Sequence, residues 1–585
     1  MKRLKALILT TTAAAVLAGC GGSPSPAPAA AVNTPAAPQL AWAAFVDRYV
    51  EDYFKAHPVF ATLQGRHEFD GKFPDWSRAG IQREIARMHA ARDAAVAYGD
   101  AALSDEQRFE RGYLLARIDR DLYSLEVAES PFKNPGFYLG ASDGGDNVDP
   151  SVYITHPYAS PDVRARAFIE YAKSVARVSA DIRANLPEAM PTTFVKLGVA
   201  GFGGLADFYR KDVPLAFAAV TDPALKKALT DAIEPAAKAM QGLADWIKSN
   251  EGKATAVQPL GAEKYAKMLQ MTERVDLPIA TVEAAGRADM ERNIAALAVE
   301  CAKIAPKASL TACVEKVMKD KPAGGAVAGA RAQLAGLRQF IVDKDIVSIP
   351  GTEIAQVAEA PAFNRQNFAY IDIPGPYDKG LPSTYYIAPP DPSWSKAEQA
   401  DYLPGKSSLL FTSAHEVWPG HFLQFLHSNR VSSRVGQLWV GYAFAEGWAH
   451  YAEEMMWEKG LGNGDPATHV GQLTQALMRD ARLLCSIGMH THGMTLAECE
   501  KLMNEQGFQN PGQSRQQAAR GTYDAGYLNY TMGKLMIRKL RADWSATRGG
   551  EKAWKQFHDE FLSFGGPPIP LVRARMLGAN AGPAL

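Results

Sequence analysis

Helical periodicity is the feature that most constrains how this chain folds. From residue 40 to 346, apolar residues recur at three- and four-residue spacing in one window after another. That spacing puts them on one face of an α-helix, and Asp or Ser stands near several of the window starts, as at helix N-termini. The clearest predicted helices are Trp42–His57, Arg78–Tyr98, Asp105–Ser130, Ser160–Leu186, Pro223–Ser249 and Pro278–Ile304. The pattern predicts a mainly α fold with a helical N-terminal lobe over residues 40–346.

The composition changes near residue 347, where Pro, Gly, Tyr and β-branched residues become frequent. Three short strands separated by Pro and Gly are predicted at Glu353–Ala358, Phe368–Ile373 and Ser383–Ile387. They would form a small sheet whose edge can pair with an extended peptide. The chain then becomes helical again, with predicted helices at Leu409–His427, Tyr442–Lys459, Val470–His492, Leu496–Glu505 and Asp524–Trp544. We therefore predict a second lobe over residues 347–585, since 585 residues are enough for two lobes.

The N-terminus carries a targeting signal. A basic start with Lys2, Arg3 and Lys5 precedes a short apolar run, which ends in Leu17-Ala-Gly-Cys20. This pattern is typical of a secretory signal peptide and is too short to span a membrane. Its end resembles the bacterial lipobox, which implies that residues 1–19 are removed and Cys20 is lipidated. Gly21 follows, where Asp would favour retention in the inner membrane, so the expected location is the outer membrane, facing the periplasm. Residues 20–39 read as a Pro/Ala/Gly/Ser tether.

Charge and cysteine content narrow the partners and the compartment. Lys+Arg and Asp+Glu both total 63, and no basic stripe with interleaved aromatic residues occurs, so we expect no nucleic-acid partner. Beyond Cys20, four cysteines remain. In an oxidising compartment an even number favours disulfides. The simplest pairing is Cys301–Cys313 with Cys485–Cys499, and buried free thiols are the alternative.

The stretch from His415 to His421 predicts a metal site. Two imidazoles and the Glu416 carboxylate are typical components of a hydrolytic zinc centre, in which the usual His-Glu-x-x-His motif puts both histidines on one helix face. Here the histidines are six residues apart, so on a straight helix they would diverge by about 120°. Pro419-Gly420 provides the means to distort the helix. We therefore predict a bulged helix that returns His421 to the side of His415.

A catalytic zinc needs a third protein ligand and one open position. Glu446 is the preferred candidate because apolar residues flank it and a buried carboxylate needs a partner. Glu453, seven residues further on, is on the same predicted helix face and remains a rival. His450 is a candidate partner that orients a ligand from outside the coordination sphere. Glu416 is then placed to act as general base toward a zinc-activated water.

Downstream stretches carry candidate transition-state donors. One predicted helix carries His490, and Tyr523, Tyr527 and Tyr530 follow at four- and three-residue spacing. Neutral tyrosine or histidine donors commonly stabilise the oxyanion of amide hydrolysis. We also expect Tyr527, and Tyr386 from the small sheet, to contact substrate. No Gly-x-Ser-x-Gly element supports a serine hydrolase.

Four ordered motifs carry a resemblance to a known family. They are His415-Glu-Val-Trp-Pro-Gly-His421 with Gln424, Glu446-Gly-Trp-Ala-x-Tyr-Ala-Glu453, Arg482 with Gly488-Met-His490, and Tyr527-Leu-Asn-Tyr530-Thr-Met-Gly-Lys534. Together they resemble the bacterial family catalogued as domain of unknown function 885, which is grouped with the gluzincin-type metallopeptidases of the peptidase MA clan. The resemblance implies a large helical assembly around a deep cleft. It also implies His415, His421 and Glu446 as zinc ligands, Tyr530 and His490 as donors, and Arg482 as a carboxylate binder.

The leading hypothesis is a lipid-anchored zinc metallopeptidase that acts on peptides. Two alternatives remain open from the sequence. One is a non-catalytic peptide-binding lipoprotein with a degenerate site, and the other is a zinc hydrolase of non-peptide amides. The sequence does not indicate the oligomeric state of the protein.

Overall fold

The computed structural model describes residues 37–585 except 142–144, 362–363, 366–367 and 579–580. The predicted signal peptide, most of the tether and the lipidation site Cys20 lie outside the described residues. Most of the described chain is helical, with one small sheet, so the predicted mainly α fold is confirmed. Within the described residues, every helix is too short or too polar to cross a lipid bilayer.

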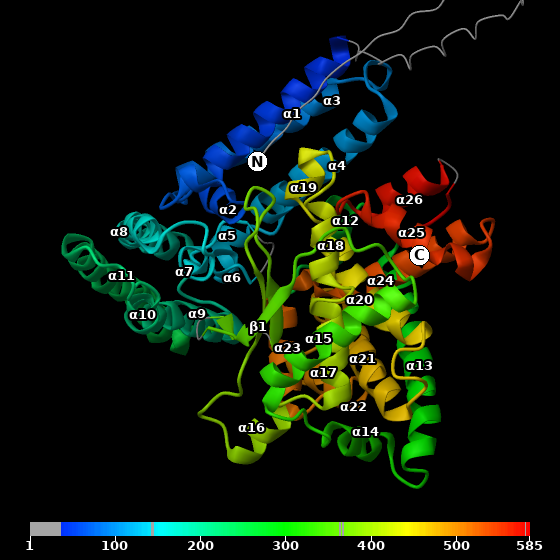
Figure 1. Ribbon diagram of the computed structural model, residues 1–585. Coiled ribbons are helices and arrows are strands. Elements are labelled where there is room, and N and C mark those ends of the chain that lie inside the picture. The colour runs from blue at the N-terminus through cyan, green and yellow to red at the C-terminus, as the bar shows by residue number, and fades with distance from the viewer. Residues whose placement is uncertain (1–36, 142–144, 362–363, 366–367, 579–580) are drawn as a thin grey trace, which may run out of the picture.

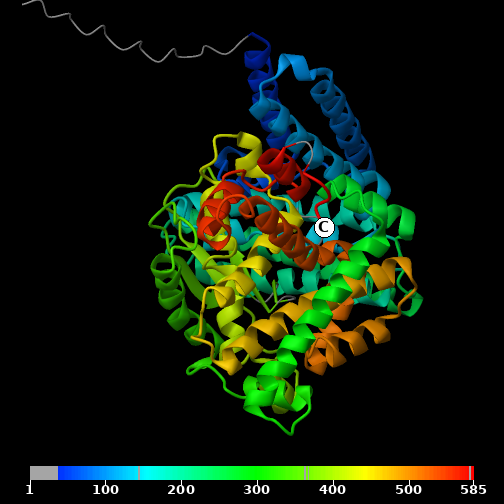
Figure 2. The ribbon, with the colours of Figure 1, turned by 90° about the vertical axis from the view of Figure 1, so that its right-hand side faces the viewer.

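The first part of the chain forms helices that flank the rest. Their bounds are α1 (Ala37–Ala56), α2 (Pro58–Leu63), α3 (Arg78–Ala97), α4 (Asp105–Leu122), α5 (Ser130–Lys133), α6 (Gly136–Leu139), α7 (Ser151–Thr155), α8 (Pro161–Asn185), α9 (Thr192–Lys211), α10 (Val213–Ala216) and α11 (Pro223–Ser249). In Figures 1 and 2, α1, α3 and α4 project beyond the remaining chain. Helices α8 and α9 both pack against α11, on the left side of Figure 1.

Caps and apolar spacing explain why these helices form where they do. Ser77 accepts a hydrogen bond from the backbone of the first turn of α3, and Ser104 forms a capping box with Gln107 at the start of α4. Along α8, buried apolar residues follow three- and four-residue steps, as at Phe168, Ala172 and Val175. Local sequence therefore sets these boundaries close to those predicted.

The remaining helices build the larger body. Their bounds are α12 (Ala262–Glu273), α13 (Ile279–Ile304), α14 (Leu310–Met318), α15 (Gly325–Asp343), α16 (Lys396–Tyr402), α17 (Lys406–Glu416), α18 (His421–Ser428), α19 (Arg434–Leu438), α20 (Tyr442–Glu458), α21 (Pro466–Thr491), α22 (Leu496–Glu505), α23 (Pro511–Tyr523), α24 (Asn529–Ser545), α25 (Trp554–Leu562) and α26 (Ile569–Leu577). Disulfides join α13 to α14 through Cys301–Cys313 and α21 to α22 through Cys485–Cys499, which are the two predicted pairings.

The small sheet lies between the helical groups (Figure 1). It consists of β1 (Ala355–Glu359), β2 (Ala369–Asp372) and β3 (Ser383–Ile387) in the order β1-β3-β2. Strand β3 pairs in parallel with β1 and antiparallel with β2, so β2 has only one partner strand and is an edge of the sheet. The residues of this edge strand line a cavity.

Three main apolar clusters hold the chain together. The largest joins α12–α15 with the sheet and the helices from α17 onward, with fully buried Trp448 and Tyr385 among its members. A second is formed mainly by α8, α9 and α11. A third joins α1, α3 and α4 to Trp439, next to α19. Helices α12–α15 thus pack with the C-terminal half, and the lobe division at residue 346 remains a prediction.

Candidate metal centre

The segment between His415 and His421 is not a single bulged helix. Helix α17 ends at Glu416, and α18 begins at His421. The connector contains a cis Trp418–Pro419 peptide, and the Val417 dihedrals leave the helical region. The predicted continuous helix over Leu409–His427 is therefore wrong, because Pro cannot continue the hydrogen-bonding pattern here. The break achieves what the bulge was expected to do: the two imidazole rings lie 4.8 Å apart at 84°.

Close backbone packing and one indole hold this connector in place. The Gly420 amide donates to the Ala414 carbonyl at 2.9 Å, and a Cβ on Gly420 would lie 1.7 Å from the His415 carbonyl oxygen. Glycine is required at this position because any side chain would overlap that oxygen. From α20, the buried Trp448 Nε1–H donates to the Pro419 carbonyl at 2.8 Å. The helix break and α20 are thereby positioned relative to each other.

Helix α20 brings Glu446 to the two histidines. It crosses α24 closely where Gly447 meets Gly533: a Cβ on Gly533 would lie 2.2 Å from the Ala443 carbonyl oxygen. The crossing orients the start of α20 so that Glu446 faces the connector between α17 and α18. Its carboxylate is mostly buried, with 18% of the side chain exposed.

The donor atoms of these three residues form a compact group. Oε2 of Glu446 lies 3.2 Å from Nε2 of His415 and 3.2 Å from Nε2 of His421. All three donors lie within 4.8 Å of one another. Ligands at about 2.0–2.1 Å from a tetrahedral zinc would be about 3.3 Å apart. The two 3.2 Å distances match this spacing, so this donor group could hold a metal ion such as zinc.

Glu453 is oriented differently from Glu446 although both belong to α20. Its Oε1 lies 2.7 Å from Nδ1 of His415, and the Arg479 guanidinium lies 3.0 Å from the same oxygen. A His415 tautomer that donates from Nδ1 to Glu453 leaves the Nε2 lone pair directed at the metal position. Glu453 therefore occupies the orienting position predicted for His450, whose Nδ1 lies 3.7 Å from Oε2 of Glu453.

Burial and the charges of neighbouring residues both shift the pKa values of the side chains in this centre. Burial and the Arg479 charge lower the pKa of His415, but Glu446 and Glu453 outweigh them, and the net shift is upward. Burial alone would raise the pKa of Glu446, yet the histidine charges and hydrogen bonds bring it well below its usual value. Burial raises the pKa of Glu416, with smaller opposing effects from His415 and His421.

A cavity of about 950 Å³ opens onto this centre. Its wall includes His415, Glu416, His421 and Glu446. Glu416 is 6% exposed, and no hydrogen bond or ion pair joins its carboxylate to another described residue. Edge strand β2 and residues of α21 and α23 also line this cavity.

Tyr530 and two arginines lie beside the histidines in the same cavity wall. The Tyr530 ring stacks on His415 with centroids 6.1 Å apart. An Arg520 Nη2–H donates to the Tyr530 hydroxyl at 3.3 Å, and the Arg482 guanidinium lies 4.5 Å from the centroid of that ring. Burial raises the pKa of Tyr530, so the phenol remains protonated.

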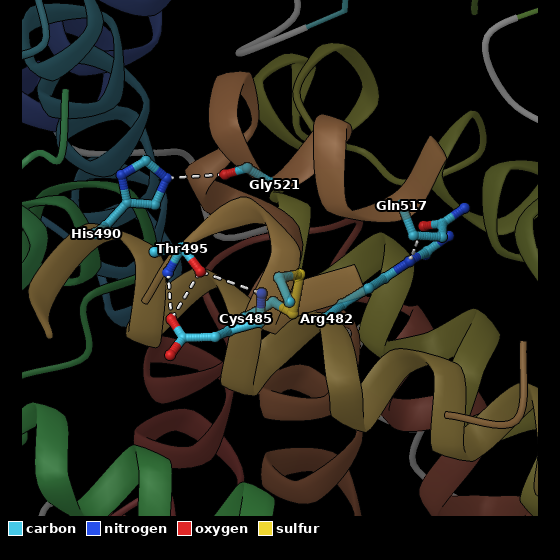
Figure 3. Close-up of a disulfide and its surroundings, with 8 residues drawn as sticks. Arg482, Cys485, His490, Thr495, Gln517 and Gly521 are labelled. Carbon is cyan, nitrogen blue, oxygen red and sulfur yellow. Dashed lines mark hydrogen bonds between the residues drawn. A yellow bond between two sulfur atoms is a disulfide. The ribbon is translucent and has the colours of Figure 1, made fainter. Parts of the chain in front are cut away.

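Three predicted site residues do not line this cavity in the described part of the chain. His490 Nε2 hydrogen-bonds with the Gly521 carbonyl at 2.8 Å and points away from Arg482 on the same helix (Figure 3). Tyr527 is fully buried and packs against Gly521. Tyr386 stacks on Tyr370 at 5.2 Å. The structure does not bring these three side chains to the cavity wall, and their roles in the site remain predictions.

Strand and helix geometry explains why Tyr386 and His490 lie away from the cavity. On β3 the side chains alternate, so Tyr385 joins the core beside α17 and Tyr386 is directed to the other face. The charge of Glu416 contributes to raising the pKa of Tyr385, after burial, which indicates that the two are close. Spacing on α21 likewise separates Arg482 from His490 by eight residues, more than two turns.

Sequence reasoning also missed residues. Arg479 and Arg520 were not given roles, although each lies in the cavity wall. Arg479 occurs three residues before Arg482 on one helix, a spacing that puts both on the same face. That spacing was the available signal, and only the packed structure shows that the face borders the histidines.

Comparison with known proteins agrees with the fold described above. A family model described as bacterial protein of unknown function (DUF885) matches residues 58–576. A candidate lipoprotein of unknown function from Shewanella oneidensis has 23% identity and a TM-score of 0.73, covering 92% of this chain and 99% of its own.

A candidate lipoprotein from Colwellia psychrerythraea has 16% identity and a TM-score of 0.73, covering 93% of this chain and 99% of its own. At these identities the likeness concerns the fold. No significant match was found among curated proteins. Because the family model spans most of the chain, the protein belongs to the DUF885 family of bacterial proteins of unknown function.

Proposed function

We propose that the protein is a zinc-dependent metallopeptidase. The observation that carries this proposal is the position of Glu446 Oε2, 3.2 Å from Nε2 of both His415 and His421 in the wall of a large cavity. Helices α17, α18 and α20 contribute one donor each, and Glu416 lies next to His415 in the chain. Two neutral imidazoles and a carboxylate are a donor set used by catalytic zinc.

His415, His421 and Glu446 would hold the ion, with Glu453 orienting His415 from outside. When bound, zinc lowers the pKa of a coordinated water toward about 7 and acts as a Lewis acid. Glu416 supplies the base: its buried carboxylate has no partner among the described residues, and its raised pKa suits it to accept a proton from water and return it to the leaving amine.

Tyr530 supplies a neutral hydrogen-bond donor. Arg520 donates into the phenol oxygen, which leaves the hydroxyl hydrogen free to donate to a substrate oxygen. The ring is held by its stacking on His415 and by the Arg482 guanidinium. Donation from a fixed position to the oxyanion that develops during amide hydrolysis would lower the barrier.

Strand β2 supports a peptide as the substrate. Residues Ala369–Asp372 line the cavity. One edge of this strand pairs with β3, and within the described residues the three-stranded sheet has no further strand on its other edge. An extended peptide can add to such an edge through main-chain hydrogen bonds that do not depend on its sequence. This contact favours peptides over other amides.

The test is the Glu416→Gln variant. We expect zinc content equal to that of the wild type and peptide hydrolysis slower by at least about 100-fold, since general base catalysis contributes about 10²–10⁴-fold. Zinc is measured by elemental mass spectrometry and hydrolysis on a mixed peptide library. Glu315→Gln removes an exposed carboxylate from the same cavity wall and serves as the matched control.

Four outcomes would contradict the proposal. Wild-type protein that binds no zinc, or a Glu416→Gln variant with full activity, would rule out the mechanism. Zinc binding and peptide binding without hydrolysis would indicate a non-catalytic binding protein. Hydrolysis of non-peptide amides alone would support the proposed hydrolytic mechanism but exclude peptides as the substrate.

We further propose that Cys20 carries the lipid anchor and that the protein faces the periplasm from the outer membrane. The lipobox-like sequence and the description of both structural relatives as candidate lipoproteins support this. Cys20→Ser should move the protein from the outer-membrane fraction to the soluble fraction in fractionated cells. Retention of the variant in the membrane fraction would count against the anchor.

A further inference from the structure

Arg482 is a buried cation in the cavity wall. Only 6% of the residue is exposed, and no carboxylate of the described chain lies within 4.0 Å of its guanidinium. The neighbouring arginines differ: Arg479 is paired with Glu453 at 3.0 Å and Arg520 with Asp524 at 2.9 Å. A buried unpaired charge is costly, so such a group is retained when it has an anion to bind.

The side chain is held in a defined orientation. Its Nε–H donates to Oε1 of Gln517 at 2.8 Å, as Figure 3 shows, and its guanidinium lies over the Tyr530 ring. Arginine has five N–H donors, and this contact uses one of them. The Nη groups have no hydrogen-bond partner among the described residues and are not fully buried, and the residue lines the cavity. A bidentate pair of donors is therefore available to a ligand in the cavity.

Arg482 is also close to the proposed metal centre. The same Tyr530 ring that it covers at 4.5 Å stacks on His415 with centroids 6.1 Å apart. One aromatic ring separates the cation from a metal ligand. An extended peptide advances about 3.3–3.6 Å per residue, so one or two residues span such a gap.

The cavity wall also contributes uncharged polar groups. The amide side chains that line it include Gln475, Asn504, Gln509, Gln513, Gln516 and Gln517, and Gln517 is bonded to Arg482. They can hydrogen-bond to a peptide without cancelling the positive charge. The anion that fits is a carboxylate, because its two oxygens match a guanidinium fork.

We propose that Arg482 binds the C-terminal carboxylate of the peptide substrate, so that the protein releases one or two residues from the C-terminus as a carboxypeptidase. This proposal rests on the proposed function and names its substrate class. In the reaction, the water oxygen bonds to the scissile carbonyl carbon, the C–N bond breaks, and the leaving amine takes the proton held by Glu416. Arg482 positions the substrate and takes no part in bond exchange.

The first experiment compares three peptides of one sequence: a free C-terminal acid, a C-terminal amide, and an N-acetylated free acid. Zinc-loaded wild-type protein is used, and products are identified by mass spectrometry over time. We expect both acids to lose one or two residues from the C-terminus. The amide should react at least about 30-fold more slowly, since it leaves a buried charge unpaired.

The second experiment removes the cation. Arg482→Met should lower kcat/KM for the free acid by at least about 30-fold while the amide changes little, so that the acid-to-amide ratio falls toward one. Arg482→Lys should restore part of this ratio. Lys319→Met, which removes an exposed cation from the same cavity wall, should leave the ratio unchanged. Zinc content and the unfolding midpoint are measured for each variant, and a structural defect alone would slow both peptides equally.

Several results would overturn the proposal. Equal cleavage of acid and amide, or internal cleavage, would exclude carboxylate anchoring and leave the peptidase proposal intact. Fast, Arg482-dependent cleavage of amides that end in Asp or Glu would show that a side-chain carboxylate is the anion. Failure of zinc-loaded wild type to cleave any peptide would exclude the peptidase proposal itself, and this inference with it.

Discussion

Nδ1 of His415 lies 2.7 Å from Oε1 of Glu453, and both side chains are almost completely buried. A carboxylate bonded to the far nitrogen of a histidine fixes the tautomer and ring orientation that a metal requires. Arg479 holds Glu453 in turn, at 3.0 Å. The rival third ligand of the sequence analysis is thus hydrogen-bonded to a histidine of the donor group.

This relationship predicts the effect of Glu453→Gln. An amide can still accept a hydrogen bond but carries no charge, so zinc affinity should fall by about 10–100-fold. Zinc competition titration measures the change. Glu458→Gln, on the same helix and paired with Arg541, is the control and should leave zinc affinity unaltered. Unchanged affinity in Glu453→Gln would show that this contact does not serve the metal.

Gly420 predicts a second result. A methyl group there would lie 1.7 Å from the His415 carbonyl oxygen, so Gly420→Ala must displace the connector that carries His421. We expect zinc affinity to fall and the free energy of unfolding to drop by about 1–3 kcal/mol. Gly242→Ala is the matched control, because its Cβ would meet no atom within 4 Å in the middle of α11. It should stabilise the protein by about 0.5–1 kcal/mol. A Gly420→Ala variant with wild-type zinc affinity would contradict the geometry.

The pH dependence of stability tests a contact far from the metal centre. His67 bridges Asp70 and Asp378, each at 3.0 Å, and so connects the N-terminal helices to the segment after β2. Burial opposes its charge, but the two carboxylates outweigh burial and raise the pKa of His67 to about 9.

Because the folded pKa exceeds the unfolded value of about 6.5, the charged histidine stabilises the fold fully below pH 6.5. The contribution is lost as the pH rises through 9. The difference in unfolding free energy between wild type and His67→Gln should be about 1 kcal/mol or less at pH 6, as for partly exposed pairs, and smaller at pH 9.5. Chemical denaturation measures it, with His89→Gln on an exposed His–Glu pair as control. A difference that grows with pH would refute the assignment.

Local sequence patterns were enough to predict the helical class, the small sheet before the histidine motif and the cluster of candidate donors. For the cysteines they favoured the observed pairing but left free thiols open. These follow from local patterns: apolar spacing, caps, turn residues and short-range cysteine spacing act within a few residues of one another. Helix α11 begins and ends at the predicted residues, Pro223 and Ser249. Helix α23 was missed, because Gly, Gln and Arg obscure its apolar face.

Tertiary packing decided what each candidate does. Glu446 and Glu453 share one helix, and only the close crossing of α20 and α24 at Gly447 and Gly533 determines which carboxylate lies between the two imidazoles. The periodicity of a sequence predicts on which face of a helix a residue lies. It does not predict how far that face is from another helix or strand. For the same reason the sequence predicts His490 as a site residue although it is bonded to Gly521, while Arg482, two turns earlier, lines the cavity with no counter-ion among the described residues.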